Sequence, residues 1–343
     1  GAEIPRMAEA DLRGGLKGVR LSYGGATVEV ALFGAHILSW TTPGASGAPV
    51  ERLWLSSCSP LDGSAPIRGG IPIAWPQFAT DGAMPLHGFA RERLWAVVDS
   101  SDDAAHASAS LTLELSDSPH TADGTWRSPA APPFPWRFRL RLKVTLGATH
   151  LQLALEATNL GRAAMGGEES AERMAFTTCL HTYFRSADST QVRLSGGLQG
   201  VQFVDKVDGM KVKRHGVDVA SQTPDSLTVE EAAMESNGFV DRIYCHENPS
   251  KGIAQVLHVG RGLDPSAPEA ESTYDLHQSA GFSNTVVFNP WKEGKRGPAH
   301  PDFDDDGYKY MICVEPAVAK PSQAVELKQG ESWKGECLIS IRN

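Results

Sequence analysis

The alternating segment WRFRLRLKVTL, at residues 136–146, is the feature that most constrains the fold. Its apolar side chains fall on every second position, and arginines and a lysine fill most of the positions between them. Side chains of a strand alternate between two faces, so this pattern predicts a half-buried antiparallel strand. A second alternating run, at 151–157, follows directly after the short segment GATH. The two runs therefore predict a β-hairpin.

Short strand-like runs recur along the chain, whereas amphipathic helical patterns are nearly absent. The best helical candidate is EEAAME at 230–235. Many strands with turn signals between them favour a large β-sandwich over a fold of alternating strands and helices. We therefore predict an all-β protein of antiparallel strands. Further strands are expected at 19–23, 27–32, 36–40, 110–115, 174–184, 242–246, 254–259, 284–289, 310–315 and 337–341.

The length of 343 residues allows one large domain or two of ordinary size. Polar stretches rich in glycine, proline and alanine interrupt the strand pattern without changing the composition on either side, which is typical of loops inserted into one domain. We predict a single domain over residues 1–343. Its core is expected at about 17–341, with residues 1–16 as an N-terminal extension.

Composition and missing motifs exclude several classes of function. The formal net charge of −9 argues against nucleic-acid binding, so an anionic small ligand would need a local cluster of arginines. No apolar run approaches the roughly 18 residues of a membrane helix. The five scattered cysteines contain no CxxC pair and indicate reduced thiols in a cytoplasmic protein. Glycine-rich nucleotide-binding motifs are missing as well, so we expect no cofactor.

The stretch RGGIPIAWPQFATDGAMPLHGFAR, at 68–91, gathers polar side chains where glycines and prolines prevent regular structure. Its aromatic residues would hold it in place, which predicts an ordered loop that presents Arg68, Gln77, His87 and Arg91 to a ligand. The alternative is a surface loop that is basic at its ends. Trp75, like Trp291 elsewhere, would either stack on a ligand or belong to the core.

Two further residues could carry proton chemistry. Glu315 ends the apolar run YMICVE, and burial of a carboxylate raises its pKa toward the range of a general base. His181 lies in the apolar run at 174–184, on the same face as Cys179. Each residue also has a structural explanation: His181 as a hydrogen-bonded core residue, and Glu315 as the partner of a neighbouring strand or of an arginine.

A metal site has little support in the sequence. The segment DFDDDG at 302–307 matches the first half of a calcium-binding loop, but the twelfth position is Cys313 instead of glutamate. The eleven histidines include no HxH or HExxH pair. We interpret 302–307 as a solvated acidic turn and expect no metal.

Seven short motifs then occur in an order that resembles the aldose 1-epimerase superfamily, and more narrowly its glucose-6-phosphate 1-epimerase branch. The resemblance runs from about residue 17 to residue 341. The motifs are RGGIPIAWPQF, LHGFAR, CLHTYF, FVD at 203–205, DRIY at 241–244, VFNPW and MICVEP.

This resemblance implies a galactose-mutarotase-like β-supersandwich that interconverts the α and β anomers of a hexose 6-phosphate without cofactor or metal. By position, His181 resembles the catalytic acid of the family and Glu315 its catalytic base. Arg68 and Arg91 resemble residues suited to the phosphate. Gln77, His87 and Asp205 resemble residues that line the sugar pocket. The partner would be a small hexose phosphate, and we expect a monomer.

The chain departs from the family pattern at two places. Ala317 replaces a frequent glycine after VEP, and the segment at 166–173 is longer than usual and is expected to form an outward loop.

Other functions stay open at this point. A glycoside hydrolase would use Glu315 and Asp205 as its carboxylate pair. A sugar-binding or regulatory protein, or a mutarotase of unphosphorylated aldoses, would keep the same fold.

Overall fold

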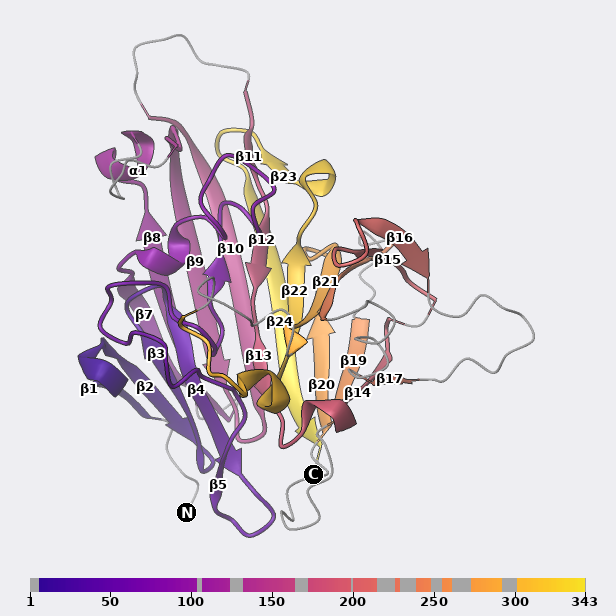
Figure 1. The fold of residues 1–343 in the computed structure, drawn as a ribbon. Coiled ribbons are helices and arrows are strands. Elements are labelled where there is room, and N and C mark those ends of the chain that lie inside the picture. Colours follow the sequence, from indigo (N-terminus) through magenta and orange to yellow (C-terminus); the bar gives the residue numbers. More distant parts are fainter. Residues whose placement is uncertain are drawn as a thin grey trace.

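The computed structural model describes residues 6–103, 107–123, 132–163, 172–198, 200–214, 226–228, 239–247, 255–260, 273–291 and 301–342. Antiparallel sheets dominate this part of the chain (Figure 1). Its one α-helix among the described residues is the short α1, Pro119–Asp123. The 3-10 turns are η1 Arg13–Gly15, η2 Ala90–Glu92, η3 Ser189–Gln191, η5 Gly307–Tyr310 and η6 Pro321–Gln323. The all-β prediction is confirmed.

Two large sheets form the body of the molecule. The nine-stranded sheet has the order β17-β14-β19-β20-β24-β10-β9-β8-β7, and the eight-stranded sheet has the order β16-β15-β18-β21-β22-β12-β6, with β13 also paired to β22. The strands of the first are β7 Ala96–Asp103, β8 Ser108–Ser116, β9 Trp136–Leu146, β10 His150–Arg162, β14 Arg193–Gly196, β17 Ser226–Thr228, β19 Gln255–Gly260, β20 Thr273–Gln278 and β24 Ser332–Arg342. Those of the second are β6 Ile73–Ala74, β12 Thr178–Leu180, β13 Tyr183–Arg185, β15 Gln202–Asp205, β16 Lys211–Arg214, β18 Val240–Cys245, β21 Asn284–Asn289 and β22 Met311–Val318.

Two smaller sheets complete the described fold. A five-stranded sheet at the N-terminal side consists of β1 Arg6–Asp11, β2 Lys17–Tyr23, β3 Ala26–Ala31, β4 His36–Pro43 and β5 Pro49–Glu51, and a two-stranded sheet pairs β11 Met174–Phe176 with β23 Val325–Leu327. The described part of the N-terminal extension thus adds an edge strand, because β1 pairs along its whole length with β2. No helix of the described residues is long and apolar enough to cross a membrane. The predicted helical segment at 230–235 lies outside the described residues.

The predicted hairpin forms the centre of the nine-stranded sheet. Leu146 of β9 pairs with Leu151 of β10, and the apolar side chains of both strands point inward. Leu142 and Leu153 join Ile312 and Val314 of β22 in one buried cluster, so the core lies between the two large sheets. Burial of each such side chain contributes about 1.5–3 kcal/mol. The charged positions of β9 face outward, where the Arg141 guanidinium pairs with Glu114 of β8 at 2.8 Å.

β22 is buried along all eight residues, and its two faces have different roles. Ile312 and Val314 point into the core cluster, whereas Cys313 packs against aromatic residues on the other side. Because side chains alternate along a strand, Glu315 lies on the same face as Cys313 and opposite the core. The strand therefore presents one carboxylate, surrounded by apolar side chains, to the site described below.

The predicted strand at 174–184 is interrupted twice. It forms β11, β12 and β13, and His181 and Thr182 lie in the break between the last two. The His181 N–H donates to the carbonyl of Pro72 at 3.0 Å, and the Thr182 N–H turns back to the carbonyl of Leu180 at 2.8 Å. His181 is therefore held at a bend between strands, which corrects the expectation of a continuous strand.

The loop at 68–91 is ordered, as predicted, with only β6 and the start of η2 as regular structure. Trp75 is fully buried and meets Phe89 edge to face at 5.4 Å, so this tryptophan belongs to the core. Gly88 has a φ of +67°, and a Cβ there would lie 2.3 Å from the Trp75 carbonyl oxygen. Only glycine fits so close to the Trp75 carbonyl, and the neighbouring His87 is thereby held next to Trp75.

Candidate active site

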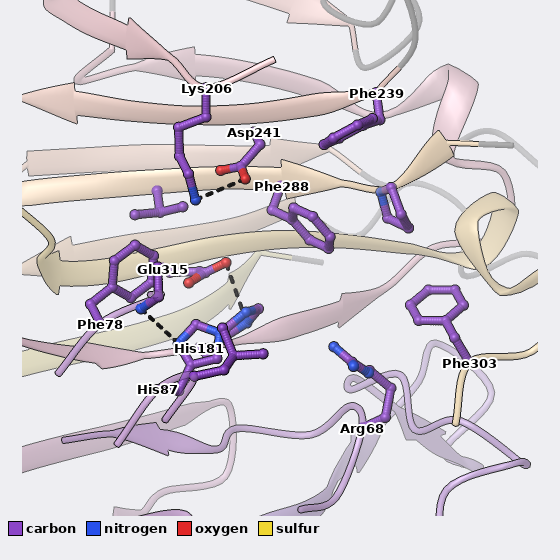
Figure 2. A pocket seen from close by; sticks show the side chains of 14 residues that line it. Arg68, Phe78, His87, His181, Lys206, Phe239, Asp241, Phe288, Phe303 and Glu315 are labelled. Carbon is purple, nitrogen blue, oxygen red and sulfur yellow. Dashed lines mark hydrogen bonds and ion pairs between the residues drawn. The ribbon is translucent and has the colours of Figure 1, made fainter. Parts of the chain in front are cut away.

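His181 and Glu315 meet at the floor of a cavity between the loop at 68–91 and the eight-stranded sheet (Figure 2). The Nδ1 atom of His181 lies 3.3 Å from Oε1 of Glu315. The two residues come from neighbouring segments, because β12 and β13 on either side of His181 both pair with β22. The structure thus brings together the two residues predicted to transfer protons.

Glu315 is fully buried, and this burial raises its pKa well above the usual value. The Cys179 thiol donates a hydrogen bond to Oε2 at 3.0 Å, which fixes one carboxylate oxygen and leaves Oε1 facing His181. A thiol is a weak donor and compensates little of the cost of burial. The carboxyl group therefore holds a proton more tightly than an exposed glutamate does.

The His181 ring shows the opposite shift. Burial lowers its pKa well below the usual value, and the charges of Arg68 and Arg91 act in the same direction. The ring stacks on Tyr183, with centroids 4.7 Å apart and an angle of 7° between the planes. Both shifts favour the uncharged pair, with the proton on Glu315 and a neutral His181. Such a pair suits general acid and base roles.

His87 completes this side of the cavity. Its backbone has a φ of +63°, and its ring meets His181 edge on at 5.3 Å. The Nδ1 atom accepts a hydrogen bond from the Ala79 N–H at 3.2 Å. Burial, followed by the nearby Arg91 charge, lowers the pKa of His87, so the ring is neutral and carries its proton on Nε2. His87 can therefore donate to a ligand oxygen.

Arg68 and Arg91 lie close enough to repel each other. Arg68 donates from Nε to Asp302 at 3.0 Å and from Nη1 to the Tyr183 hydroxyl at 3.3 Å. Arg91 donates to the Leu86 carbonyl at 2.7 Å. Burial, together with repulsion from Arg68, lowers the pKa of Arg91 to about 10, so both arginines are charged at neutral pH. A bound anion would relieve this repulsion.

The site has two compartments that share a wall. The first, of about 250 Å³, contains Glu315 and is lined by Phe78, Phe288 and Phe303. The second, of about 350 Å³, contains Arg91, Tyr183 and Asp302. Both are lined by Arg68, Leu86, His87 and His181. The acid–base pair and the arginine pair therefore belong to one site of a size suited to a small molecule.

Two of the predicted sugar-binding residues lie elsewhere. Gln77 is buried and ties the loop together, because its side-chain NH2 donates to the carbonyls of Ala79 and Met84 and its oxygen accepts from the Met84 N–H. Asp205 is fully buried and pairs with Lys213 at 2.8 Å. Neither lines the two compartments described here. Both predictions of a sugar contact therefore find no support in the geometry.

Lys206 and Asp241 line the first compartment instead, on the far side of Glu315 from Arg68 (Figure 2). The Lys206 ammonium lies 2.9 Å from Asp241 Oδ2 and 5.7 Å from the centre of the Phe78 ring. No sequence signal singled out Lys206, because alternation places it opposite Asp205 without showing which of the two sides meets the cavity. Asp241 opens the DRIY motif, which carried the resemblance without a role for this residue.

The acidic turn at 302–307 is less solvated than expected. Asp302 pairs with Arg68, and both Asp304 oxygens accept hydrogen bonds from the Ser57 N–H. These carboxylates therefore orient a site arginine and fix a neighbouring loop.

The predicted outward loop at 166–173 falls almost wholly outside the described residues, which resume at Glu172. Ala317 is fully buried in β22 and pairs with Cys179.

Known proteins resemble the chain over nearly its full length. The sequence profile of the family described as "Aldose 1-epimerase" matches residues 17–340. A protein of Salmonella typhimurium named "Putative glucose-6-phosphate 1-epimerase" is 33% identical over 90% of this chain and 85% of its own length. A protein of Cenchrus ciliaris with the same name is 31% identical over 91% and 80%.

Solved structures share the fold. A crystal structure described as a putative mutarotase from Salmonella typhimurium has a TM-score of 0.70 at 25% identity and covers 99% of this chain and 94% of its own. A galactose mutarotase-like protein from Clostridium acetobutylicum has a TM-score of 0.61 at 16% identity, with 99% of each chain covered. The fold is therefore the galactose-mutarotase-like β-sandwich expected from the sequence.

Proposed function

The chain belongs to the aldose 1-epimerase family, and from this premise we propose that it interconverts the α and β anomers of a hexose 6-phosphate. The observation that carries the proposal is the shared wall between the two compartments. It places an acid–base pair next to two converging arginines, a combination suited to a sugar that carries an anionic group. Glucose 6-phosphate is the substrate we infer, in agreement with the names of the related proteins.

The reaction needs one base and one acid. Glu315 takes the proton from the anomeric hydroxyl while His181 gives a proton to the ring oxygen, and the ring opens to the aldehyde. Rotation about the C1–C2 bond and closure on the other face of the carbonyl give the other anomer, with the two residues in exchanged roles. Each group supplies a factor of about 10²–10⁴ in rate. The pKa shifts place the proton of the pair on Glu315 in the free protein, so the assigned roles require it to pass to His181 across their 3.3 Å contact when the sugar binds.

The remaining residues position the substrate. Arg68 and Arg91 contact the phosphate, because planar guanidinium groups form paired hydrogen bonds to its oxygens. His87, neutral and protonated on Nε2, donates to the sugar near the junction of the compartments. Asp241 and Lys206 offer an acceptor and a donor to the ring hydroxyls. The apolar walls exclude water, which strengthens each of these contacts.

The experiment is a measurement of anomer exchange by proton NMR at equilibrium. Glucose 6-phosphate, galactose 6-phosphate, mannose 6-phosphate and free glucose are compared with and without protein. We expect the largest acceleration for a hexose 6-phosphate and a much smaller one for glucose. Equal acceleration of glucose would reassign the protein to unphosphorylated aldoses. Binding without acceleration would indicate a sugar-binding protein, and a released product would indicate a hydrolase.

A further inference from the structure

We propose that the floor of the first compartment is also a binding site for Zn²⁺, and that zinc bound there inhibits the enzyme. The donors are His181, Cys313 and Glu315, with Cys179 beside them. The binding part of this inference is independent of the proposed function, whereas the inhibition rests on it. Inhibition follows from the identity of the ligands, because zinc would occupy both proton-transferring groups at once.

The four side chains share one face of two paired segments. Cys179 and His181 are two residues apart, as are Cys313 and Glu315, and the segments are joined by the pairing of β12 and β13 with β22. One ligand atom from each of His181, Cys313 and Glu315 lies within 4.8 Å of the others, and all three residues are buried. The Cys179 sulfur lies 3.0 Å from Oε2 of Glu315.

This donor set fits zinc better than other common cations. Zinc takes four ligands among thiolate, imidazole and carboxylate, with ligand atoms roughly 3.3–3.8 Å apart in a tetrahedron. Side-chain rotations of His181 and Cys313 would close the present separations. Calcium and magnesium prefer six or more oxygen ligands, and this cluster offers a single carboxylate. The sequence motifs did not reveal this cluster, because its two halves, at 179–181 and 313–315, are more than a hundred residues apart.

Two atoms in the cluster call for a ligand. His181 Nδ1 and Glu315 Oε1 are buried, and neither has a hydrogen-bond partner among the described residues, although they lie 3.3 Å apart. A buried polar atom without a partner costs free energy, so a bound cation would satisfy both. Entry is open, because both residues line the cavity.

Charges around the cluster do not exclude a cation. Lys206 and Arg68 face the compartment and are paired with the carboxylates of Asp241 and Asp302, respectively. Arg91 acts on His181 from the second compartment and opposes the cation with its charge. Zinc must displace the protons of the carboxyl and thiol groups, since the ligands bind in their deprotonated forms. Binding therefore releases protons and weakens as the pH falls.

The test begins with direct binding of zinc to the full chain after treatment with EDTA and removal of the chelator. Titration calorimetry with ZnCl₂ should show one saturable site in the wild type. Cys313→Ala should weaken zinc binding at least tenfold, because even loss of an outer partner of a metal ligand costs about 10–100-fold. Cys337→Ala removes a buried thiol from β24, which belongs to the other large sheet, and should leave the affinity unchanged.

Co²⁺ provides a second measurement that needs no variant, because a thiolate ligand gives a charge-transfer absorption band. The band should appear in the wild type and be absent from Cys313→Ala. In the exchange assay zinc should inhibit the wild type and EDTA should restore the rate. The rate of Cys313→Ala in zinc should equal its own rate in EDTA, whatever that rate is relative to wild type.

Two results would overturn the inference: absence of a saturable zinc site in the wild type, or equal zinc affinity in Cys313→Ala. Failure of the proposed function would look different. Zinc would then bind and the cobalt absorption band would appear as expected, while no sugar showed faster anomer exchange.

Discussion

The two compartments of the site treat charge in opposite ways. In the first, Glu315 and His181 are buried among apolar side chains, with a thiol as the one hydrogen-bond donor to the carboxylate within the described residues. In the second, Arg68 is held by Asp302 and Tyr183, and Arg91 by a backbone carbonyl. Isolation shifts the pKa values of the first pair, whereas hydrogen bonding keeps the second pair charged and oriented.

Under the proposed function, this difference separates chemistry from recognition within one fold. Burial with few partners favours the uncharged form of each group, a protonated Glu315 and a neutral His181, and so shifts their two pKa values in opposite directions. A group that must bind an anion benefits from fixed partners, because its geometry is set before the ligand arrives. Tyr183 joins the two halves, since its ring stacks on His181 and its hydroxyl accepts from Arg68.

The largest effect on the rate of anomer exchange is expected from substitutions in the first compartment. Glu315→Gln and His181→Asn each remove a proton-transferring group and should lower kcat by about 10²–10⁴-fold. Affinity for the substrate should change much less, because the arginines are intact. NMR exchange rates and ligand titration measure the two quantities. A variant that kept more than half of the wild-type rate would remove that residue from the mechanism.

The second effect concerns His36, which supports the second compartment. Its Nε2–H donates to the carbonyl of Gly69 at 2.8 Å, and burial lowers its pKa from 6.5 to about 4. The unfolded chain then binds more protons between these values. The contribution of His36 to the free energy of unfolding is therefore fully present above pH 6.5 and falls by up to about 3 kcal/mol toward pH 4. Urea unfolding of wild type and His36→Gln at pH 5 and 7.5 tests this, and His36→Gln should show the weaker pH dependence.

His246 offers a matched control for His36. Burial also lowers its pKa to about 4, but it bonds to Thr285 and does not line either compartment. His246→Gln should change the pH dependence of unfolding in the same direction while the KM for glucose 6-phosphate stays constant. A raised KM in His246→Gln would show that loss of a buried histidine disturbs the site even without contact to it.

The third effect tests recognition of the phosphate. Arg68→Ala and Arg91→Ala should each raise the KM for glucose 6-phosphate at least tenfold, because a charge-assisted contact contributes about 1.5–3 kcal/mol. The slow reaction of free glucose should hardly change. Arg137→Ala, on the exposed face of β9, is the control and should leave both substrates unaffected. If either site variant impaired both sugars equally, that arginine would support the loop instead of binding phosphate.

The smallest effect is expected for Gln77. Its three hydrogen bonds hold the loop between Ala79 and Met84, and each contributes about 0.5–1.5 kcal/mol. Gln77→Ala should lower the free energy of unfolding by about 1–3 kcal/mol and raise KM modestly for phosphorylated and free sugars alike. A loss confined to one epimer of the sugar would instead restore Gln77 as a direct contact.

The sequence determined the fold class and the main chemistry by itself. Alternation in β9 and β10 predicted the hairpin and its inward face, because the period of two depends only on local geometry. The motifs around Arg68, His87, Arg91, His181 and Glu315 identified residues that the structure brings to one site. Their roles in the reaction remain predictions that the variants above would test.

Only the tertiary structure decided which side of a strand faces the cavity. Asp205 and Lys206 are neighbours in sequence, yet one is paired within the sheet and the other lines the site, because a one-residue shift reverses the face of a strand. Likewise, Cys179 and Cys313 looked like unrelated scattered thiols until strand pairing placed them beside Glu315. Such contacts join residues more than a hundred positions apart, and no local pattern in the chain encodes them.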